Sequence, residues 1–595
     1  MISEVNMTDR DGAKRTSEQP DTVSSRRDEW RTQKQKKTRQ NDDMKSQDTR
    51  KHPEGLPFLF LTEMWERFGY YLIIGIFVLY MTDIDKGGLQ FADMRADDIF
   101  GTFIAFTYLT PFIGGFLADK KLGYIKSIYI GGTLMGLGYL SLAVPDLPFF
   151  YAGICLIVIG NGFFKPSIST LLGNLYDDPQ YMSNKDSGYN IFYMGINTGA
   201  FICNIFAAFM RNKFSWSAAF ATAGVGMFLG LIIFTIGLKH YRSANVIKPK
   251  QENEMSPMEI MFKVFLPAII AGILGWLIPG NIFGSDSTDA FLFAVIPVVG
   301  FFTSLYFRAD FSERKRIGVL LAVYVVSIMF WAVFKQNGTA LTRWAKYYTD
   351  REMPQTISDV AETLYLAEKV STETKEVTQY DKSFQAIKVD GKPIKAIGKD
   401  VYFQNMDPAL MEVKQQQPNV VLMNTELFQS INPFWVVALT PLVIGFFQLL
   451  RRRGKEPTTP SKIAWGLFIS ALSTLVMVLA VWAGNNGQIK VSPLWLVACY
   501  GVITVGELFL SPMGLSLVSK LSPPRITGLM MGGFFLSISV GNKLSGVLAS
   551  MWYGYENKAN FFLVNGVLLL GATVLAWMML KWMNQVFRDT TQEGN

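Results

Sequence analysis

The chain has 595 residues, of which 50% are hydrophobic, 14% aromatic and 17% charged. Its many apolar stretches approach the ~20 residues that a helix needs to cross a bilayer, which excludes a soluble globular protein and indicates a polytopic helical membrane protein. The formal net charge of +8 does not indicate a nucleic-acid partner, because the basic residues mostly follow the ends of apolar runs, as the positive-inside rule describes.

The cysteines and histidines favour neither metal nor imidazole chemistry. Cys155, Cys203 and Cys499 lie in apolar runs without metal-ligand spacing, which is typical of free thiols in membrane helices. His52 and His240 lie outside the apolar runs, so no imidazole is expected to carry protons inside the membrane. The motifs of nucleotide, zinc and triad chemistry are also missing, and we expect neither an enzyme nor a cofactor.

The N-terminal segment differs in composition from the rest. Residues 1–53 are polar and cannot bury a core, so we expect a disordered tail, and the segment lacks the apolar centre of a signal peptide. The hydropathy that follows predicts fourteen membrane helices in the order six, two, six, near residues 57–81, 99–118, 127–145, 148–172, 187–210, 216–238, 259–282, 288–308, 315–340, 431–451, 462–484, 493–519, 526–552 and 559–586.

The charges of the loops predict the orientation. The segments "DKKLGYIK", "KHYRS", "ERKR", "RRRGK" and "SPPR" all fall on the cytoplasmic side if the N-terminus is cytoplasmic, whereas the mostly acidic "DIDKGGLQFADMRADD" falls outside. This bias of Lys and Arg, together with an even number of crossings, predicts that both termini are cytoplasmic.

One polar segment, residues 345–430, interrupts the pattern on the outer side. Its "SDVAETLYLAEKVS" predicts a short amphipathic helix after a Ser or Asp cap, and the alternation in "FQAIKVDGKPIKAIGKDVYF" predicts a β-hairpin around Asp390 and Gly391. Two interpretations remain open, a solvated spacer or a module that recruits substrate or a partner.

Seven ionisable side chains fall inside five of the predicted membrane helices. A charge there is costly unless it faces a polar cavity or an opposite charge. Fixed salt bridges between helices are one interpretation, but buried ion pairs often fail to recover their desolvation cost. A water-filled cavity with gates made of charge pairs explains so many charges better. The residues are Glu63, Glu66, Arg67, Lys165, Lys335, Glu507 and Lys543, and no partner of Lys543 is evident.

Six motifs carry a family resemblance. They are ExxERFxYY at Glu63–Tyr71, "GGFLADKKLG", "GNGFFKPSISTLLGNLY", "FYMGINTGA" at Phe192–Ala200, "INPFWVVALTP" and "GELFLSPMG". In this order they resemble the first helix, the loop between helices two and three, and the fourth, fifth, eighth and tenth helices of the proton-dependent oligopeptide transporters, a family of the major facilitator superfamily. The resemblance extends over about residues 56–586 apart from the insertion, and the two extra helices are similar to those of bacterial members.

The resemblance implies an all-α major facilitator fold of two six-helix bundles plus two linker helices, fourteen transmembrane helices in all, in the inner membrane. We expect these domains: a disordered tail (1–53), an N-terminal bundle (54–238), a cytoplasmic linker with the two extra helices (239–310), the first helix of the C-terminal bundle (311–344), a periplasmic insertion (345–430), the remaining C-terminal bundle (431–587) and a cytoplasmic tail (588–595).

For function, the resemblance implies alternating access that couples inward proton flow to uptake of di- and tripeptides, with protons as the coupling ion. The expected partners are small peptides and the lipid bilayer, with no nucleic acid. Arg67 and Lys165 would hold the peptide carboxylate, and Glu507 would hold its amino group. The other residues implied are Glu63 and Glu66 for proton coupling, Asp119 for cytoplasmic gating, and Tyr70, Tyr71, Tyr108, Asn197, Trp331, Asn432 and Ser511 for the pocket.

The chemistry of the implied site suits a free peptide. A zwitterion fits cations on one bundle and an anion on the other. Charge-assisted contacts to its two ends do not involve the peptide side chains, which permits broad specificity. A carboxylate that loses Arg67 to the substrate takes up a proton more readily, which is a physical route to coupling. Arg67, Lys165 and Glu507 would therefore take part in coupling as well as binding.

Three positions depart from the family pattern. Ile74 stands where the first-helix motif usually continues to an arginine, and Lys335 stands where the seventh helix usually has a glutamate. In the family, the arginine and the glutamate at these two positions are similar to a gating salt bridge on the outer side. Two interpretations of Lys335 remain open. It is a relocated cation that pairs with Glu507, or its presence in place of the acid damages proton coupling. Phe534 replaces a common tryptophan on helix eleven and would change the shape of the pocket.

We therefore expect a proton-coupled peptide symporter with atypical gating or selectivity. A carrier of nitrate or of another anionic or modified-peptide solute is the nearest alternative, since the positive charge of Lys335 suits an anion. A transporter-like sensor that signals through its polar tail or insertion is the second, because fold alone does not fix function.

Overall fold

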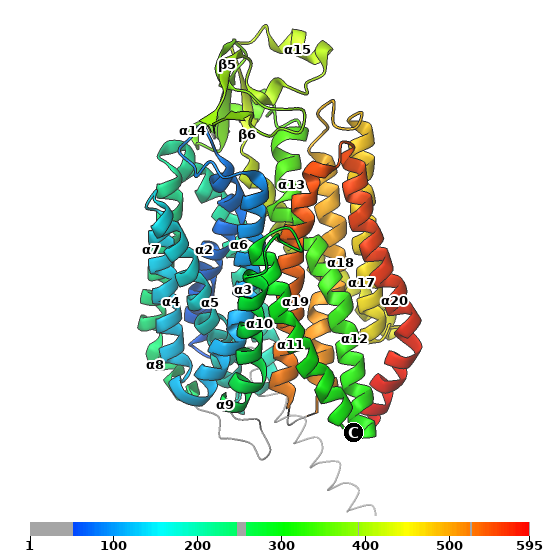
Figure 1. The fold of residues 1–595 in the computed structure, drawn as a ribbon. Coiled ribbons are helices and arrows are strands. Elements are labelled where there is room, and N and C mark those ends of the chain that lie inside the picture. The colour runs from blue at the N-terminus through cyan, green and yellow to red at the C-terminus, as the bar shows by residue number, and fades with distance from the viewer. Residues whose placement is uncertain (1–51, 247–256, 391, 524–525, 594–595) are drawn as a thin grey trace, which may run out of the picture.

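The computed structural model describes residues 52–246, 257–390, 392–523 and 526–593 (Figure 1). Helices occupy each of the fourteen predicted segments. Eleven helices of the described residues are long and apolar enough to cross a membrane, and Met261–Trp276 is a shorter apolar helix. The predicted disordered tail lies outside the described residues except for its last two.

The first six long helices pack around one hydrophobic core. This core draws its buried side chains from residues between Leu56 and Ala244, including Phe77, Phe103 and Tyr139. We call this group the N-terminal half. Its helices are α2 (Leu56–Thr82), α3 (Asp93–Leu117), α4 (Tyr124–Leu142), α5 (Leu147–Leu175), α6 (Lys185–Lys213) and α7 (Trp216–Ile236), followed by the short α8 (Leu238–Tyr241).

The last six long helices, the C-terminal half, surround two further hydrophobic clusters, one centred on residues such as Leu320, Leu467 and Leu517 and one on Trp344 and Trp552. The helices are α12 (Phe311–Phe334), α16 (Ile431–Arg452), α17 (Thr459–Ala483), α18 (Leu494–Leu521), α19 (Thr527–Ser550) and α20 (Lys558–Glu593). The limits proposed for the domains stay a prediction.

Two shorter helical segments lie between the halves in sequence. The first runs through α9 (Pro257–Ile260), the π-helical η4 (Met261–Phe265) and α10 (Leu266–Trp276), and the second is α11 (Asp286–Arg308). They pack against each other and leave apolar side chains such as Ile273 and Ile296 exposed. An apolar surface of this kind suits contact with lipid.

The halves meet most closely where α3 crosses α19. A Cβ atom added to Gly546 would lie 2.7 Å from the carbonyl oxygen of Asp97, and one added to Gly101 would lie 3.0 Å from Cα of Gly546. Small residues let the two backbones approach. Ser539 on α19 also donates to the carbonyl of Ala105 on α3 at 2.7 Å, so this crossing joins the two halves by close packing and by a hydrogen bond.

The helix that contains Lys335 changes geometry at that residue. After α12 ends at Phe334, the chain continues through the 3₁₀-helical η5 (Lys335–Gly338), α13 (Ala340–Arg343) and the π-helical η6 (Trp344–Tyr348). Irregular turns of this kind within long helices often occur at functional sites. The change places Lys335 at a bend, with Arg343 two turns beyond it.

The insertion combines short helices with three two-stranded antiparallel sheets. β1 (Ala367–Ser371) pairs with β6 (Asn419–Met423), β2 (Lys375–Thr378) with β5 (Lys395–Gly398), and β3 (Lys388–Val389) with β4 (Lys392–Pro393). The other elements are α14 (Gln355–Thr363), η7 (Val401–Phe403), α15 (Pro408–Lys414) and η8 (Thr425–Ser430).

The sequence predicted two of these features. The pairing of Val389 with Lys392 confirms the hairpin, although Gly391 lies outside the described residues. The amphipathic helix is present as α14, but the Ser or Asp cap was wrong. The helix begins earlier, after Pro354, without a side-chain cap, and Ser358 lies buried inside it. A proline fixes φ at a value that suits the start of a helix, which explains the earlier beginning.

The insertion lies at one end of the helices, and α20 ends at the other (Figure 1). We call these the insertion end and the opposite end. Lys86, between α2 and α3, pairs with Glu368 on β1 at 2.6 Å, and Arg211 on α6 pairs with Glu426 in η8 at 3.2 Å. On the other side Thr349 bridges Val491, which precedes α18. The insertion thus contacts both halves.

Candidate substrate site

The charged cluster on α2 is an internal network of that helix. Arg67 donates to both carboxylate oxygens of Glu66 and lies 3.4 Å from Oε1 of Glu63. All three side chains are buried. The guanidinium also reaches Oδ1 of Asn161 on α5 at 3.5 Å. Because the ion pairs lie within one helix, they do not join helices, and fixed helix-to-helix salt bridges do not account for these charges.

Two lysines lie around the ring of Tyr108, which is on α3. Nζ of Lys165, from α5, is 4.3 Å from the ring centroid, and Nζ of Lys335, from η5, is 5.7 Å from it. Lys335 also lies 5.7 Å from the ring of Trp331, whose own centroid is 6.4 Å from that of Tyr108. Tyr108 is therefore the point at which the cations of the two halves meet.

The acid of the C-terminal half lies on α18. The carboxylate of Glu507 accepts a hydrogen bond from Asn432 of α16 at 3.3 Å, and Asn432 also donates to Thr504 at 2.9 Å. Tyr108 is within electrostatic range of both Glu507 and Arg67. The site thus places cations and an acid from opposite halves around one tyrosine.

Several polar atoms in this region are buried without a hydrogen-bond partner. The set includes Oε2 of Glu63, the hydroxyl of Tyr70, the indole nitrogen of Trp331 and Oγ of Ser511. A buried polar atom without a partner is costly, and a polar ligand or water in the site would supply the missing partners.

Other predicted residues have different surroundings. Asn197 donates to the carbonyl of Tyr193 in its own helix at 2.9 Å, and Phe534 packs in the core beside Tyr324 with ring centroids 6.1 Å apart. Tyr71 packs edge-on against Tyr70 at 5.4 Å. Their roles as ligands of a substrate stay predictions.

The predicted pairing of Lys335 with Glu507 is not formed. Within the described part of the chain, neither Lys335 nor Lys165 has an ion-pair or hydrogen-bond partner. The Lys335 ammonium lies among aromatic rings instead, 5.6 Å from the ring centroid of Phe334. Lys335 influences Glu507 only at longer range. Ile74 is buried in the apolar core, so the usual outer pair has no counterpart at these two positions.

Two other ion pairs join the halves at the insertion end, and the sequence reasoning missed both. Arg343 on α13 binds Asp97 on α3 at 2.7 Å, and Lys543 on α19 binds Asp98 on α3 at 2.6 Å. The boundary of the second predicted helix explains the omission. That segment was expected to start near residue 99, but α3 starts at Asp93, which brings both aspartates into the helix.

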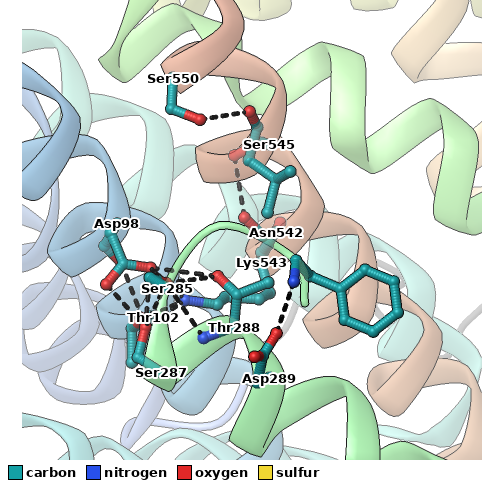
Figure 2. A network of polar contacts seen from close by, with 12 residues as sticks. Asp98, Thr102, Ser285, Ser287, Thr288, Asp289, Asn542, Lys543, Ser545 and Ser550 are labelled. Atoms are coloured by element: carbon teal, nitrogen blue, oxygen red, sulfur yellow. Dashed lines mark hydrogen bonds and ion pairs between the residues drawn. The ribbon is translucent and has the colours of Figure 1, made fainter. Parts of the chain in front are cut away.

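Figure 2 shows the surroundings of Lys543, whose partner was not evident from the sequence. Its ammonium donates to Asp98, to Thr102 at 2.7 Å and to Ser287 of α11 at 2.8 Å. Ser285, which caps α11, also donates to Asp98 at 2.9 Å. The linker helix α11 is thereby fastened to both halves.

A cavity of about 260 Å³ separates the halves nearer the opposite end. Its lining comes from both halves and includes Asp119 of η1 (Ala118–Leu122), Pro166 of α5 and Phe535 of α19. The gating role of Asp119 stays a prediction. The two halves are thus joined by ion pairs at the insertion end and have a cavity between them nearer the opposite end.

Tyr193 is a further residue that sequence reasoning missed. It is partly exposed, lies one turn before Asn197 on α6, and is within electrostatic range of Glu507 and Tyr108. The signal was present, because Tyr193 falls within the motif "FYMGINTGA" at helical spacing from Asn197.

Comparisons with known proteins show which family the chain resembles. The sequence profile of the POT family matches residues 125–362 and 411–564. The chain is 27% identical over 531 residues to the di-/tripeptide transporter of Lactococcus lactis (87% of this chain, 93% of that protein) and 26% identical over 509 residues to dipeptide and tripeptide permease A of Escherichia coli (84% and 85%).

Solved structures give the same result. A crystal structure of the peptide transporter POT in complex with sulfate is similar with a TM-score of 0.68 at 28% identity, covering 90% of this chain and 96% of that one. The major facilitator fold expected from the sequence is confirmed, and the protein is an integral membrane protein. Because the family profile matches more than half of its length, the chain belongs to the POT family of transporters.

Proposed function

We propose that this protein is a proton-coupled symporter that imports di- and tripeptides across a bacterial inner membrane, with both termini in the cytoplasm and the insertion in the periplasm. The relatives named as di- and tripeptide transporters support the substrate class. The basic loops on the opposite end from the insertion support the orientation.

The arrangement of charge around Tyr108 is the observation that carries the proposal. Lys165 belongs to the N-terminal half and lies over the ring of Tyr108. Glu507 belongs to the C-terminal half and interacts electrostatically with the same tyrosine. A peptide with free ends can bridge the halves, its carboxylate toward Lys165 and its amino group toward Glu507. Charge-assisted hydrogen bonds of this kind are stronger than neutral ones.

Proton coupling is proposed to use the carboxylates of α2. Glu66 and Glu63 share the guanidinium of Arg67 in the absence of substrate. A peptide carboxylate that draws Arg67 away leaves one of these carboxylates without its partner in a buried site. A buried carboxylate without a counter-charge takes up a proton more readily. Protonation then favours the conformational change that carries the substrate and the proton across the membrane together.

Gating is proposed to have moved from the usual position to other residues. Lys335 carries the wrong sign for the outer pair of the family, and Asp97–Arg343 and Asp98–Lys543 join the same two halves instead. Opening of the insertion end would require these pairs to separate.

Uptake of labelled dialanine into proteoliposomes tests the proposal, with and without an inward proton gradient. We expect accumulation above equilibrium with the gradient and none without it. A Lys165→Ala protein reconstituted in parallel controls for leak. Exchange without accumulation would contradict proton coupling, and no peptide flux at all would contradict peptide transport and favour the anion carrier.

A further inference from the structure

The insertion shares a hydrophobic core with the C-terminal half. Phe384 of the insertion is 4% exposed and lies in the same hydrophobic cluster as Trp552 and Phe561, which belong to the C-terminal half. Phe428, near the end of the insertion, is buried in this cluster as well. Separating these side chains would expose a large apolar area to water, which is costly. The insertion and the C-terminal half are therefore expected to stay together.

Backbone hydrogen bonds strengthen the same interface. The amide of Asp350 in the insertion donates to the carbonyl of Val491, just before α18, at 2.8 Å. The amide of Lys490 donates in the other direction, to the carbonyl of Asn405 in the insertion, at 3.1 Å. The side chain of Asn405 also donates to the carbonyl of Gly487 at 3.3 Å. The loop between α17 and α18 thus holds the insertion through main-chain groups that do not depend on charge.

The contacts of the insertion with the N-terminal half are of a different kind. The core cluster of the N-terminal half takes no side chain from the described residues of the insertion. Polar contacts join the insertion to the loop between α2 and α3 instead, namely Lys86–Glu368 at 2.6 Å, Asp85–Thr378 at 3.1 Å and Lys388 to the carbonyl of Gln90 at 3.0 Å. Exposed ion pairs and hydrogen bonds of this kind contribute little individually, so they can break and form again.

The end of α6 adds further polar contacts with the insertion. Asn212 donates to the carbonyl of Tyr365 at 2.9 Å and to that of Ala367 at 3.3 Å. Arg211 donates to Oδ1 of Asn424 at 3.1 Å. The ring of Tyr365 also meets that of Phe209, with centroids 5.8 Å apart, but Tyr365 is 40% exposed. Water can therefore reach this contact without separation of a core.

The interface with the N-terminal half is also hollow. A cavity of about 860 Å³ lies there, and its lining includes Lys86, Arg211 and Trp216 from the N-terminal half and Glu368 and Lys375 from the insertion. Protein interiors are closely packed and hold few voids larger than a water molecule. Interfaces that form permanently are more hydrophobic than those that form transiently. The polar, loosely packed interface is thus the one suited to separation.

We infer that the insertion is a latch, which moves with the C-terminal half and holds the insertion end closed through its polar contacts with the N-terminal half. The inference rests on the proposed function, because alternating access requires this end to open. It goes beyond the ion pairs Asp97–Arg343 and Asp98–Lys543, which join the helices themselves. It also gives the insertion a role other than that of a spacer or a recruiting module.

Labelling of a buried cysteine tests the latch without any substrate. Thr339 is fully buried one turn before Arg343, and a Thr339→Cys protein without the native cysteines can be labelled in detergent with a bulky maleimide. Lys86→Gln/Asn212→Ala should increase the labelling rate about fivefold, because it removes an ion pair and two hydrogen bonds of the closed state. An unchanged rate in this variant would overturn the inference.

Lys369→Gln is the matched control. It removes an exposed ion pair with Glu362 that lies wholly within the insertion, and it should leave the labelling rate of Thr339→Cys unchanged. An increase equal to that of Lys86→Gln/Asn212→Ala would show that loss of any charge pair in the insertion has the same effect. That result would also overturn the latch.

A reversible cross-link tests the same interface in the opposite direction. Lys86→Cys/Glu368→Cys, joined by a reducible bis-thiosulfonate reagent, should lose uptake of dialanine in proteoliposomes and regain it when a reductant is added. The reagent can reach both positions, because the Lys86 and Glu368 side chains are 43% and 29% exposed. The same cross-link in Glu362→Cys/Lys369→Cys, within the insertion, should leave uptake unchanged. Full uptake by the cross-linked Lys86→Cys/Glu368→Cys protein would overturn the latch.

The two assays separate the latch from the proposed function. If the protein without cross-links does not accumulate dialanine, the proposed peptide transport is contradicted, and the labelling rates of Thr339→Cys still decide whether the insertion is a latch. If uptake is normal but labelling does not respond to Lys86→Gln/Asn212→Ala, the latch alone is wrong.

Discussion

Asp97 on α3 and Arg343 on α13 form a buried ion pair, with Oδ1 and Nη2 separated by 2.7 Å. The pair joins the N-terminal half to the C-terminal half at the insertion end. Arg343 Nη1 and Asp97 Oδ2 have no hydrogen-bond partner. Nε of Arg343 also lies 3.8 Å from Oδ1 of Asp93, whereas among the described residues Asp97 has only Arg343 within ion-pair distance. Asp98–Lys543 is a second ion pair between α3 and the C-terminal half.

Arg343→Gln should therefore weaken closure of the insertion end. Removing one member of a buried ion pair leaves the other uncompensated, at a cost of about 3–5 kcal/mol, and we expect uptake to fall by at least about tenfold. A cysteine at Thr339, which is buried beside the pair, should become more reactive toward a bulky thiol reagent added from the insertion side. This measurement requires a background without the native cysteines.

Two controls accompany that variant. Arg95→Gln removes an exposed arginine from α3, the helix of Asp97, and should leave uptake near wild type. The double variant Asp97→Asn/Arg343→Gln, which removes both charges of this pair, should be more stable than either single variant. A double variant as unstable as the singles would show that the pair does not compensate its own charges.

Lys165→Ala and Arg67→Ala should each abolish concentrative uptake of dialanine. Lys165 is the cation of the N-terminal half beside Tyr108, and loss of Arg67 removes the guanidinium that Glu63 and Glu66 share. In proteoliposomes, counterflow measures substrate binding and exchange, and gradient-driven uptake measures proton coupling. Normal accumulation by either variant would contradict the carboxylate-site assignment, provided that each protein elutes as a monodisperse species.

Glu507→Gln should weaken the binding of peptides with a free amino group more than the binding of N-acetylated peptides. The carboxylate faces the site from the C-terminal half while its other contact, with Asn432 at 3.3 Å, is compatible with an amide. Loss of a charge-assisted contact predicts a decrease of about tenfold for dialanine. Equal losses for dialanine and its N-acetyl derivative in a competition assay would refute the role of Glu507.

Glu368, which pairs with Lys86, should remain ionised across the working pH range. Burial raises the pKa of Glu368, but the charges of Lys86 and Arg351 outweigh it and hold the pKa at about 2. A depressed pKa contributes stability that is present above the unfolded value of 4.5 and is lost as the pH falls from 4.5 toward 2. The pH dependence of uptake between pH 5 and 8 should therefore be the same in Glu368→Gln and wild type.

That prediction is measured as the ratio of uptake at pH 5.5 to uptake at pH 7.5. Thermal unfolding should show a small loss of stability in the variant, about 1 kcal/mol or less, because both side chains are partly exposed. A changed pH profile in Glu368→Gln would mean that the insertion takes part in proton sensing.

The sequence by itself determined the helical architecture and the chemical inventory of the site. Apolar runs of bilayer length are hard to place anywhere other than in membrane helices, and helices occupy every predicted segment. The charges of α2 could be recognised as candidate site residues because an ionisable side chain within an apolar run is costly and usually has a function. Local periodicity also predicted α14 and the pairing of Val389 with Lys392.

Only the tertiary structure decided which charges meet. Lys543 lies 445 positions from Asp98, and Arg343 lies 246 positions from Asp97, and nothing in the local pattern links residues so far apart. The backbone leaves α-helical geometry after Phe334, and the Lys335 ammonium lies beside the ring of Tyr108 without an ion pair to Glu507, which the local sequence pattern did not predict. A hydrophobicity pattern reports which residues are buried; which polar groups compensate each other under burial is settled by the packing of distant helices.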